Sequence, residues 1–325
     1  MNRLSVRLVC GATFVGAACA LWTTPANAQT LTGPAHGRHR IEITSTIDGT
    51  LQPSYIVVPD QDARTAAPRP LLVILHTWNF DLEQQFVAVE RETDRRGWLL
   101  LEPNFRGASD HPGGCGSLLA QQDILDAVAW VRTHYAVDPS RIYLEGWSGG
   151  GFMTLLMAAR YPDLWAAASA GAGISDLAAW YAEHSNDEFG ANLRACFSGA
   201  PSESDAIARL YREQSPLTHL RPGLTVPLDL AAGKDDPQVS VRHSLRAFRA
   251  IAPESLSEGD IEAIVSGSDR PQAGQEAVTD PLIPRRIFLR RTTANSRLTI
   301  FDGKHEWFHL SSLDWLAQHQ RTYDR

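Results

Sequence analysis

The 325-residue sequence is poor in cysteine, has no excess of positive charge and contains a single long apolar run. That run, residues 8–22, follows two arginines and precedes the small-residue triplet Ala-Asn-Ala at 26–28, which is the layout of a secretory signal peptide. A membrane-spanning helix needs about 20 apolar residues, so this run is too short, and no second run follows. We therefore expect residues 1–28 to be a signal peptide cleaved near Ala28. The remainder is expected to be secreted or periplasmic, with no membrane anchor.

The scarcity of positive charge limits the classes of partner. The chain has a formal charge of −7, and removal of the leader, with its two arginines and no acid, leaves −9 on 297 residues. Nucleic acids and anionic membranes attract basic surfaces, so this balance argues against both. Small-molecule and peptide substrates stay open, and the sequence does not predict the oligomeric state.

Two of the four cysteines, Cys115 and Cys196, lie beyond the leader. In an oxidising compartment an even pair is more often bridged than free. Neither residue has the sequence context of a catalytic thiol, so we expect a disulfide between them.

Strand-like and helix-like runs alternate from about residue 38 to the end, with no repeat or low-complexity tract. Near-continuous apolar runs suit strands buried on both faces, and apolar residues at helical spacing suit covering helices. The strands are predicted at 40–46, 55–58, 71–75, 98–101, 142–145, 166–170, 228–232 and 298–301, and the helices at 121–134 and 149–160. The alternation predicts a single α/β domain over 29–325, with a mostly parallel central sheet and helices on both faces. The first two strands are expected to form a hairpin around Asp48-Gly49.

Two long segments interrupt this rhythm. Residues 105–119 are rich in glycine, and residues 252–284 are polar with proline, serine and glycine. Segments of this length without clear structure are often lids or binding loops. Because 258–265 has helical character, a lid and a peripheral insertion both stay open for 252–284.

The motif GWSGG at 146–150 fits the pattern G-x-S-x-G. Its setting gives it weight, because a predicted strand runs directly into it and a predicted helix starts at Gly149. A serine on such a sharp turn projects its hydroxyl from the end of the sheet, and the flanking glycines let strand and helix approach closely. Ser148 is therefore the predicted nucleophile.

A serine hydroxyl needs a base within reach and a carboxylate that orients the base. Asp235 and Asp236 follow the predicted strand at 228–232, and His305 follows the one at 298–301. All three would lie at the same sheet edge as Ser148. His305 is the predicted base, and either aspartate could orient it.

Several stretches of the sequence resemble the catalytic domain of the prolyl oligopeptidase family. They are DILDAV at 123–128, VDPSRI at 137–142, GWSGGGFM at 146–153, YPDLW at 161–165, GKDDPQV at 233–239 and GKHE at 303–306. The resemblance spans most of residues 70–310 and implies an α/β-hydrolase fold. In the family's pattern G-x-x-D-x-x-V the acid falls on Asp236, so the resemblance implies Asp236 rather than Asp235.

Hydrolases of this type stabilise the oxyanion with two backbone N–H groups. One is expected from Gly149 and the second from the loop after the strand at 71–75. Related families usually have His-Gly there, whereas this chain has His76-Thr77-Trp78. Trp78 is the predicted second donor, and Thr77 is the alternative.

The resemblance implies a serine hydrolase that cleaves an amide or ester bond through an acyl-enzyme, without a cofactor. The oligopeptidases of the family carry a large propeller domain, for which this chain has no room. A serine-type peptidase is therefore expected alongside the alternative of a carboxylesterase or a carbohydrate esterase of the acetyl or feruloyl type. Trp147, Trp180 and Tyr181 are candidates for lining the substrate cleft, with packing in the core as the alternative.

The pentapeptide HEWFH at 305–309 also fits H-E-x-x-H, in which two histidines on one helical face bind zinc and the glutamate activates water. No glutamate follows His309 as a third ligand, and the motif starts almost directly after a strand. A zinc metalloprotease is thus a remote alternative, and no metal is expected. A catalytically inactive binding module is a third reading, which the complete set of Ser148, Asp236 and His305 opposes.

Overall fold

The computed structural model describes residues 32–60, 67–267 and 278–322. The predicted signal peptide, 1–28, lies outside the described residues, as does part of the segment 252–284. The described residues form one compact unit. Among the helices of the described ranges, none is long and apolar enough to cross a membrane.

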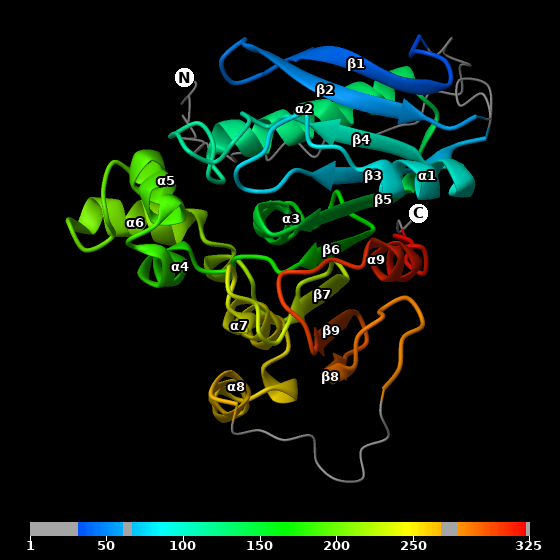
Figure 1. Ribbon diagram of the computed structural model, residues 1–325. Coiled ribbons are helices and arrows are strands. Elements are labelled where there is room, and N and C mark those ends of the chain that lie inside the picture. The colour runs from blue at the N-terminus through cyan, green and yellow to red at the C-terminus, as the bar shows by residue number, and fades with distance from the viewer. Residues whose placement is uncertain (1–31, 61–66, 268–277, 323–325) are drawn as a thin grey trace, which may run out of the picture. The chain divides into compact units, whose positions relative to one another are not determined.

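In the described part of the chain, nine strands form one sheet in the order β1-β2-β4-β3-β5-β6-β7-β9-β8 (Figure 1). The strands are β1(Gly37–Thr44), β2(Leu51–Val58), β3(Arg69–Leu75), β4(Leu99–Pro103), β5(Val137–Trp147), β6(Ala167–Gly171), β7(Leu228–Gly233), β8(Ile287–Thr292) and β9(Ser296–Phe301). The central pairs from β4 to β9 are parallel, whereas β1, β2 and β8 pair antiparallel. The predicted α/β-hydrolase fold is confirmed.

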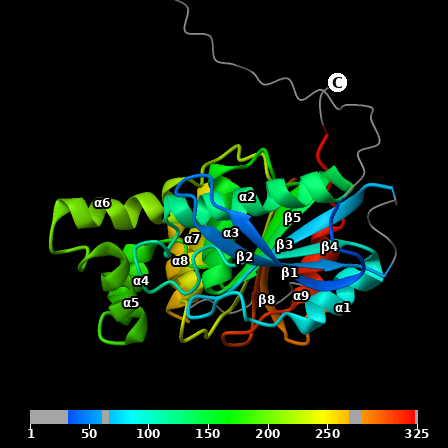
Figure 2. The ribbon, with the colours of Figure 1, turned by 90° about the horizontal axis from the view of Figure 1, so that it is seen from above.

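Helices cover both faces of the sheet. On one face lie α1(Val87–Arg96) and α9(His309–Leu316). On the other lie α2(Leu118–His134), α3(Gly149–Arg160), α7(Val241–Ile251) and α8(Glu258–Val265). After β6 the chain forms α4(Leu177–His184), α5(Glu188–Phe197) and α6(Asp205–Gln214), which lie together in both Figure 1 and Figure 2. The short 3-10 helices η1(Pro216–Thr218) and η2(Pro253–Ser255) complete the described helical elements.

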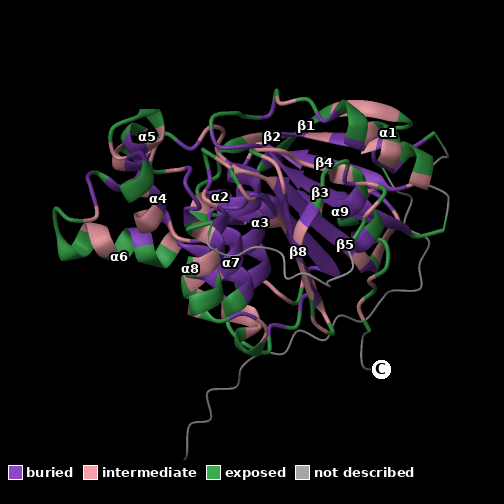
Figure 3. Ribbon diagram, turned by 60° about the horizontal axis from the view of Figure 1, so that its bottom comes forward, coloured by how far each residue is buried: buried purple, intermediate pink, exposed green. Residues whose placement is uncertain are grey.

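The apolar strands are buried on both sides because side chains alternate between the two faces. In β3, Leu72 and Ile74 pack toward α1 and α9, while Leu71, Val73 and Leu75 pack toward α2 and α3. Burial on both faces is why the central strands appear as continuous apolar runs in the sequence, and Figure 3 shows them buried.

Several parts of this architecture were not predicted, namely β8, the helices α4 to α6, and the covering helices α1, α7 and α9. β8 is an edge strand whose run includes Arg290 and Arg291, so it lacks the apolar signature used for the other strands. The helices α4 to α6 lie between β6 and β7, where the sequence analysis named no helix. In the segment 252–284, α8 occupies the stretch 258–265 that showed helical character.

Candidate active site

Ser148 lies on the turn between β5 and α3, in a strained backbone conformation. Its φ is 59° and its ψ is −121°, a region that residues with a side chain rarely adopt. Its N–H donates to the carbonyl of Gly171 at 2.8 Å. A Cβ on Gly146 would lie 2.3 Å from the carbonyl oxygen of Gly150, and one on Gly150 would lie 2.2 Å from that of Leu75. The glycines of the motif are thus required by close backbone approach.

His305 and Asp236 form a hydrogen-bonded pair. The Nδ1 of His305 lies 2.7 Å from Oδ2 of Asp236. The second carboxylate oxygen, Oδ1, accepts the N–H groups of Gln238 and Val239 at 2.8 and 3.0 Å. The Asp236 side chain is 0% exposed, so its carboxylate is held in one position. A carboxylate at Nδ1 favours the tautomer that leaves Nε2 free to accept a proton.

Asp235, the other aspartate at the end of β7, has a different environment. Its side chain is 65% exposed, and its carboxylate pairs with the ammonium of Lys234 at 3.1 Å. The geometry therefore favours Asp236 as the partner of His305.

The sheet order brings the three side chains to one edge. Ser148 follows β5, Asp236 follows β7 and His305 follows β9, and these strands run parallel. The imidazole of His305 lies 4.4 Å, between ring centroids, from the indole of Trp147, the residue before Ser148. Ser148 and His305 are not hydrogen-bonded to each other in this structure. Such contacts often tighten when a substrate binds.

Two backbone N–H groups near Ser148 are available as oxyanion donors. A Cβ on Gly149 would lie 2.3 Å from the nitrogen of Trp78, so the two peptides are adjacent. Within the described residues, neither of these N–H groups donates a hydrogen bond. The N–H of Thr77 instead donates to Oε1 of Gln84 at 2.7 Å. This favours Trp78 over Thr77 as the second donor.

The three aromatic candidates for the cleft differ in their surroundings. Trp180 is 1% exposed, its ring centroid lies 4.6 Å from that of Trp78, and its indole N–H donates to the carbonyl of Gln238 at 2.9 Å. Trp180 therefore packs in the core, against Trp78 and the loop that carries Asp236. Trp147 and Tyr181 are partly exposed, and their predicted contact with substrate stays a prediction.

His184 reinforces the same loop. Its Nε2 lies 2.8 Å from the carbonyl oxygen of Gln238, and its Nδ1 lies 2.6 Å from Oδ2 of Asp187. Helix α4 thus supports the segment that carries Asp236 with two side chains. The sequence analysis missed this, because nothing in the spacing of α4 indicates which loop it contacts.

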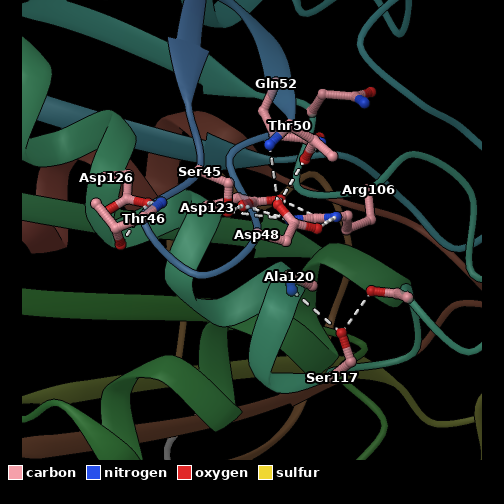
Figure 4. A network of polar contacts seen from close by, with 12 residues as sticks. Ser45, Thr46, Asp48, Thr50, Gln52, Arg106, Ser117, Ala120, Asp123 and Asp126 are labelled. Atoms are coloured by element: carbon pink, nitrogen blue, oxygen red, sulfur yellow. Dashed lines mark hydrogen bonds and ion pairs between the residues drawn. The ribbon is translucent and has the colours of Figure 1, made fainter.

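The glycine-rich segment 105–119 is fixed at several points. The guanidinium of Arg106 pairs with Asp48 at 2.7 Å and with Asp123 at 2.6 Å, which joins the β1–β2 turn to α2 (Figure 4). The N–H of Ser109 donates to the carbonyl of Trp78 at 2.8 Å. The segment therefore supports the proposed oxyanion residue.

Cys115 and Cys196 are joined by a disulfide. Cys115 lies in the segment 105–119 and Cys196 lies in α5. The bond therefore ties the helices after β6 to the segment that contacts Trp78.

The H-E-x-x-H pattern is not arranged as a zinc site. His309 begins α9, whereas His305 lies in the preceding loop and uses Nδ1 to pair with Asp236. Glu306 pairs with the guanidinium of Arg285 at 2.5 and 3.1 Å. In the part of the chain that the structure describes, no three His, Cys, Asp or Glu side chains are grouped to hold a metal.

Fold and site together define a class: the chain has the α/β-hydrolase fold and carries a serine, a histidine and an aspartate after parallel strands at one edge of its sheet. The model of the prolyl oligopeptidase family matches residues 119–263, which confirms the resemblance to that family. This match includes the turn at Ser148 and the loop of Asp236.

Individual relatives include both peptidases and esterases. The chain is 26% identical over 239 residues to acylamino-acid-releasing enzyme 1 of Oryza sativa subsp. japonica, covering 66% of this chain and 29% of the relative. It is 31% identical over 139 residues to feruloyl esterase B of Talaromyces funiculosus, covering 39% and 37%. Among solved structures, Pyrococcus horikoshii acylaminoacyl peptidase is similar in fold, with a TM-score of 0.56, 20% identity and coverage of 68% of this chain and 35% of that one. The chain thus spans less than half the length of each of these proteins.

Proposed function

We propose that the chain is exported and hydrolyses an ester or amide bond of a small-molecule or peptide substrate through an acyl-enzyme on Ser148. The observation that carries this proposal is the pair of His305 and Asp236 at the sheet edge where Ser148 sits on its strained turn. The export half of the proposal depends on the signal-peptide layout of residues 1–28.

The chemistry follows from the positions of the side chains. Nε2 of His305 takes the proton of Ser148 as the hydroxyl oxygen attacks the substrate carbonyl, and the N–H groups of Gly149 and Trp78 stabilise the resulting oxyanion. His305 then gives the proton to the leaving alcohol or amine, which leaves an ester on Ser148. Water, deprotonated by His305, cleaves this ester and restores the serine. Asp236 stabilises the imidazolium that forms in each half-reaction.

Two substrate classes fit this chemistry. The similarity to acylamino-acid-releasing enzyme 1 supports a peptide with an acylated amino acid, and the match to the prolyl oligopeptidase family model supports a proline-containing peptide. The similarity to feruloyl esterase B supports a feruloyl ester, and the similarity to acetylxylan esterase A of Aspergillus awamori supports an acyl ester of a carbohydrate. Both use the same nucleophile, so the bond that is cleaved depends on the surroundings of Ser148 and not on the three reacting side chains.

A substrate panel tests the proposal and separates the classes. Short p-nitrophenyl esters, a feruloyl ester and N-acylated and proline-containing dipeptide amides are compared with the wild type and with Ser148→Ala. We expect turnover of at least one class that Ser148→Ala abolishes. Turnover that survives in Ser148→Ala and is lost with a chelator would contradict the serine mechanism.

A further inference from the structure

A buried polar row crosses the sheet on the face covered by α1 and α9. Glu145 of β5, Ser169 of β6, Asp229 of β7 and Arg297 of β9 are register partners from strand to strand. Asp229 accepts hydrogen bonds from the hydroxyl of Ser169 at 3.0 Å and from Nε of Arg297 at 2.7 Å. Ser169, Asp229 and Arg297 are thus joined by hydrogen bonds.

Glu145 is the exception in this row. It is 0% exposed, and neither of its carboxyl oxygens has a hydrogen-bond partner of normal geometry within the described residues. A buried acid without a partner costs free energy, so its retention here requires a reason. Glu145 lies three residues before Ser148 on the same strand, and the mechanism above does not use it.

The groups that face Glu145 belong to the segment that carries the base. The indole N–H of Trp307 and the hydroxyl of Ser312 act on its carboxyl, and Trp307 follows His305 by two residues. The Nε1 of Trp307 is itself buried without a hydrogen-bond partner of normal geometry. A small pocket, lined by both Trp307 and Ser312, adjoins this cluster. An unpartnered acid and an unpartnered donor therefore lie together behind the loop of His305.

We propose that Glu145 is a positioning residue of the active site, which holds Trp307 and Ser312 and, through them, the loop that carries His305. A small movement of the two side chains would let the carbonyl oxygen of protonated Glu145 accept a hydrogen bond from the indole N–H of Trp307. The hydroxyl of protonated Glu145 then donates to the hydroxyl oxygen of Ser312. The inference depends on the proposed function, because it concerns the placement of the predicted base.

The protonation state of Glu145 gives this role a pH dependence. Burial, with a smaller contribution from the nearby carboxylate of Asp229, raises the pKa of Glu145 to about 8. Ser312, Trp307 and, from α1, Arg96 act in the opposite direction with smaller effect. Glu145 is therefore neutral at pH 7 and becomes a buried charge above about pH 8. We expect the loop of His305 to lose its support in that alkaline range.

Three variants test the role. Glu145→Gln keeps the shape and the hydrogen-bonding capacity but cannot ionise, Glu145→Leu removes both oxygens, and Trp307→Phe removes the indole N–H. Glu102→Gln is a matched control, because Glu102 of β4 is 3% exposed and burial also raises its pKa to about 8. For each protein, kcat and KM for a p-nitrophenyl ester and the rate of labelling by a fluorophosphonate are measured from pH 6 to 10.

The expected pattern separates positioning from general stability. Glu145→Gln should keep kcat within about twofold at pH 7 and should retain it above pH 8, where the wild type and Glu102→Gln decline. Glu145→Leu and Trp307→Phe should lower kcat and the labelling rate by about 10- to 100-fold with little change in KM, since a misplaced base costs rate and not binding.

Some results would overturn the inference while leaving the proposed function intact. These are a wild-type labelling rate in Trp307→Phe, or an alkaline decline in Glu145→Gln equal to that of the wild type. If Glu145→Leu does not fold, these two variants decide the question. The absence of any labelling of wild-type Ser148 would instead contradict the proposed function itself.

Discussion

At the scale of single residues, the most unusual feature is the backbone of Ser148. A positive φ of 59° costs a residue with a Cβ about 1–3 kcal/mol. The strained conformation places the hydroxyl of Ser148 at the sheet edge. We therefore expect this conformation to lower the stability of the fold while it supports activity.

The variant Ser148→Gly should therefore be more stable than the wild type by about 1 kcal/mol, since relief of strain exceeds the extra entropy of glycine in the unfolded chain. Ser148→Ala keeps the Cβ and should unfold at nearly the wild-type denaturant concentration. Both should lose activity by about 10⁴-fold or more. Urea unfolding followed by circular dichroism measures the difference, and equal midpoints for the two variants would argue against stored strain.

The two adjacent aspartates provide a second test at this scale. Asp236→Asn should lower kcat by about 10⁴-fold, because the imidazole of His305 loses the partner that fixes its tautomer. Asp235→Asn should change kcat by less than about twofold, because the Asp235 side chain is 65% exposed and faces Lys234. Steady-state kinetics on one ester measures both, and a larger loss in Asp235→Asn would reverse the assignment.

The residues with sequence signatures could be predicted, and those without could not. Ser148 lies in a motif between a strand and a helix, and His305 follows a strand, so the local pattern indicated both. Glu145 and His184 have no such pattern. Their positions depend on the lateral register of the sheet and on the packing of α4, which a linear sequence does not encode locally.

At the scale of elements, the disulfide between Cys115 and Cys196 joins α5 to the segment 105–119, across a sequence separation of 81 residues. Closing a loop of this length is expected to stabilise the folded state by about 2–5 kcal/mol, chiefly by restricting the unfolded chain.

The double variant Cys115→Ala/Cys196→Ala should lose stability by this amount in denaturant unfolding, and the wild type should lose a similar amount when reduced. A reductant should not change the unfolding of the double variant, which makes it the control. If a reductant does not change the free energy of unfolding of the wild type, the disulfide contributes little to stability.

The elements themselves were predictable where burial is uniform. The strands with continuous apolar runs, β3 to β7 and β9, and the helices α2 and α3 have the expected periodicity. The edge strand β8 contains two arginines, and Tyr211 is the one buried residue of α6, so neither element shows the continuous apolar run of a central strand.

At the scale of the whole molecule, two buried acids shape the dependence of stability on pH. Burial raises the pKa of Glu145 and Glu102 from 4.5 to about 8, and for Glu102 it outweighs the opposing effect of Arg38, which lies 2.7 Å from its carboxylate. Between these values the folded state keeps protons that the unfolded state releases, so the free energy of unfolding falls as pH rises from about 5 to 8. Burial lowers the pKa of His76 from 6.5, which opposes this trend below about pH 6.5. The decline should be clearest between pH 7 and 8.

The double variant Glu102→Gln/Glu145→Gln should show a flatter stability profile in that range. Denaturant unfolding at half-unit steps from pH 6.5 to 8.5 measures it, with the Asp235→Asn variant as a control for an exposed acid. Parallel profiles for the double variant and the wild type would contradict the assignment of these two groups as neutral at pH 7.

The most direct test of the central claim is to label the protein with a fluorophosphonate and to identify the modified residue by mass spectrometry. The proposed mechanism predicts a single modification at Ser148, which Asp236→Asn slows and Ser148→Ala abolishes. Modification at another residue, or no modification of a protein whose hydrolytic activity a chelator removes, would contradict it.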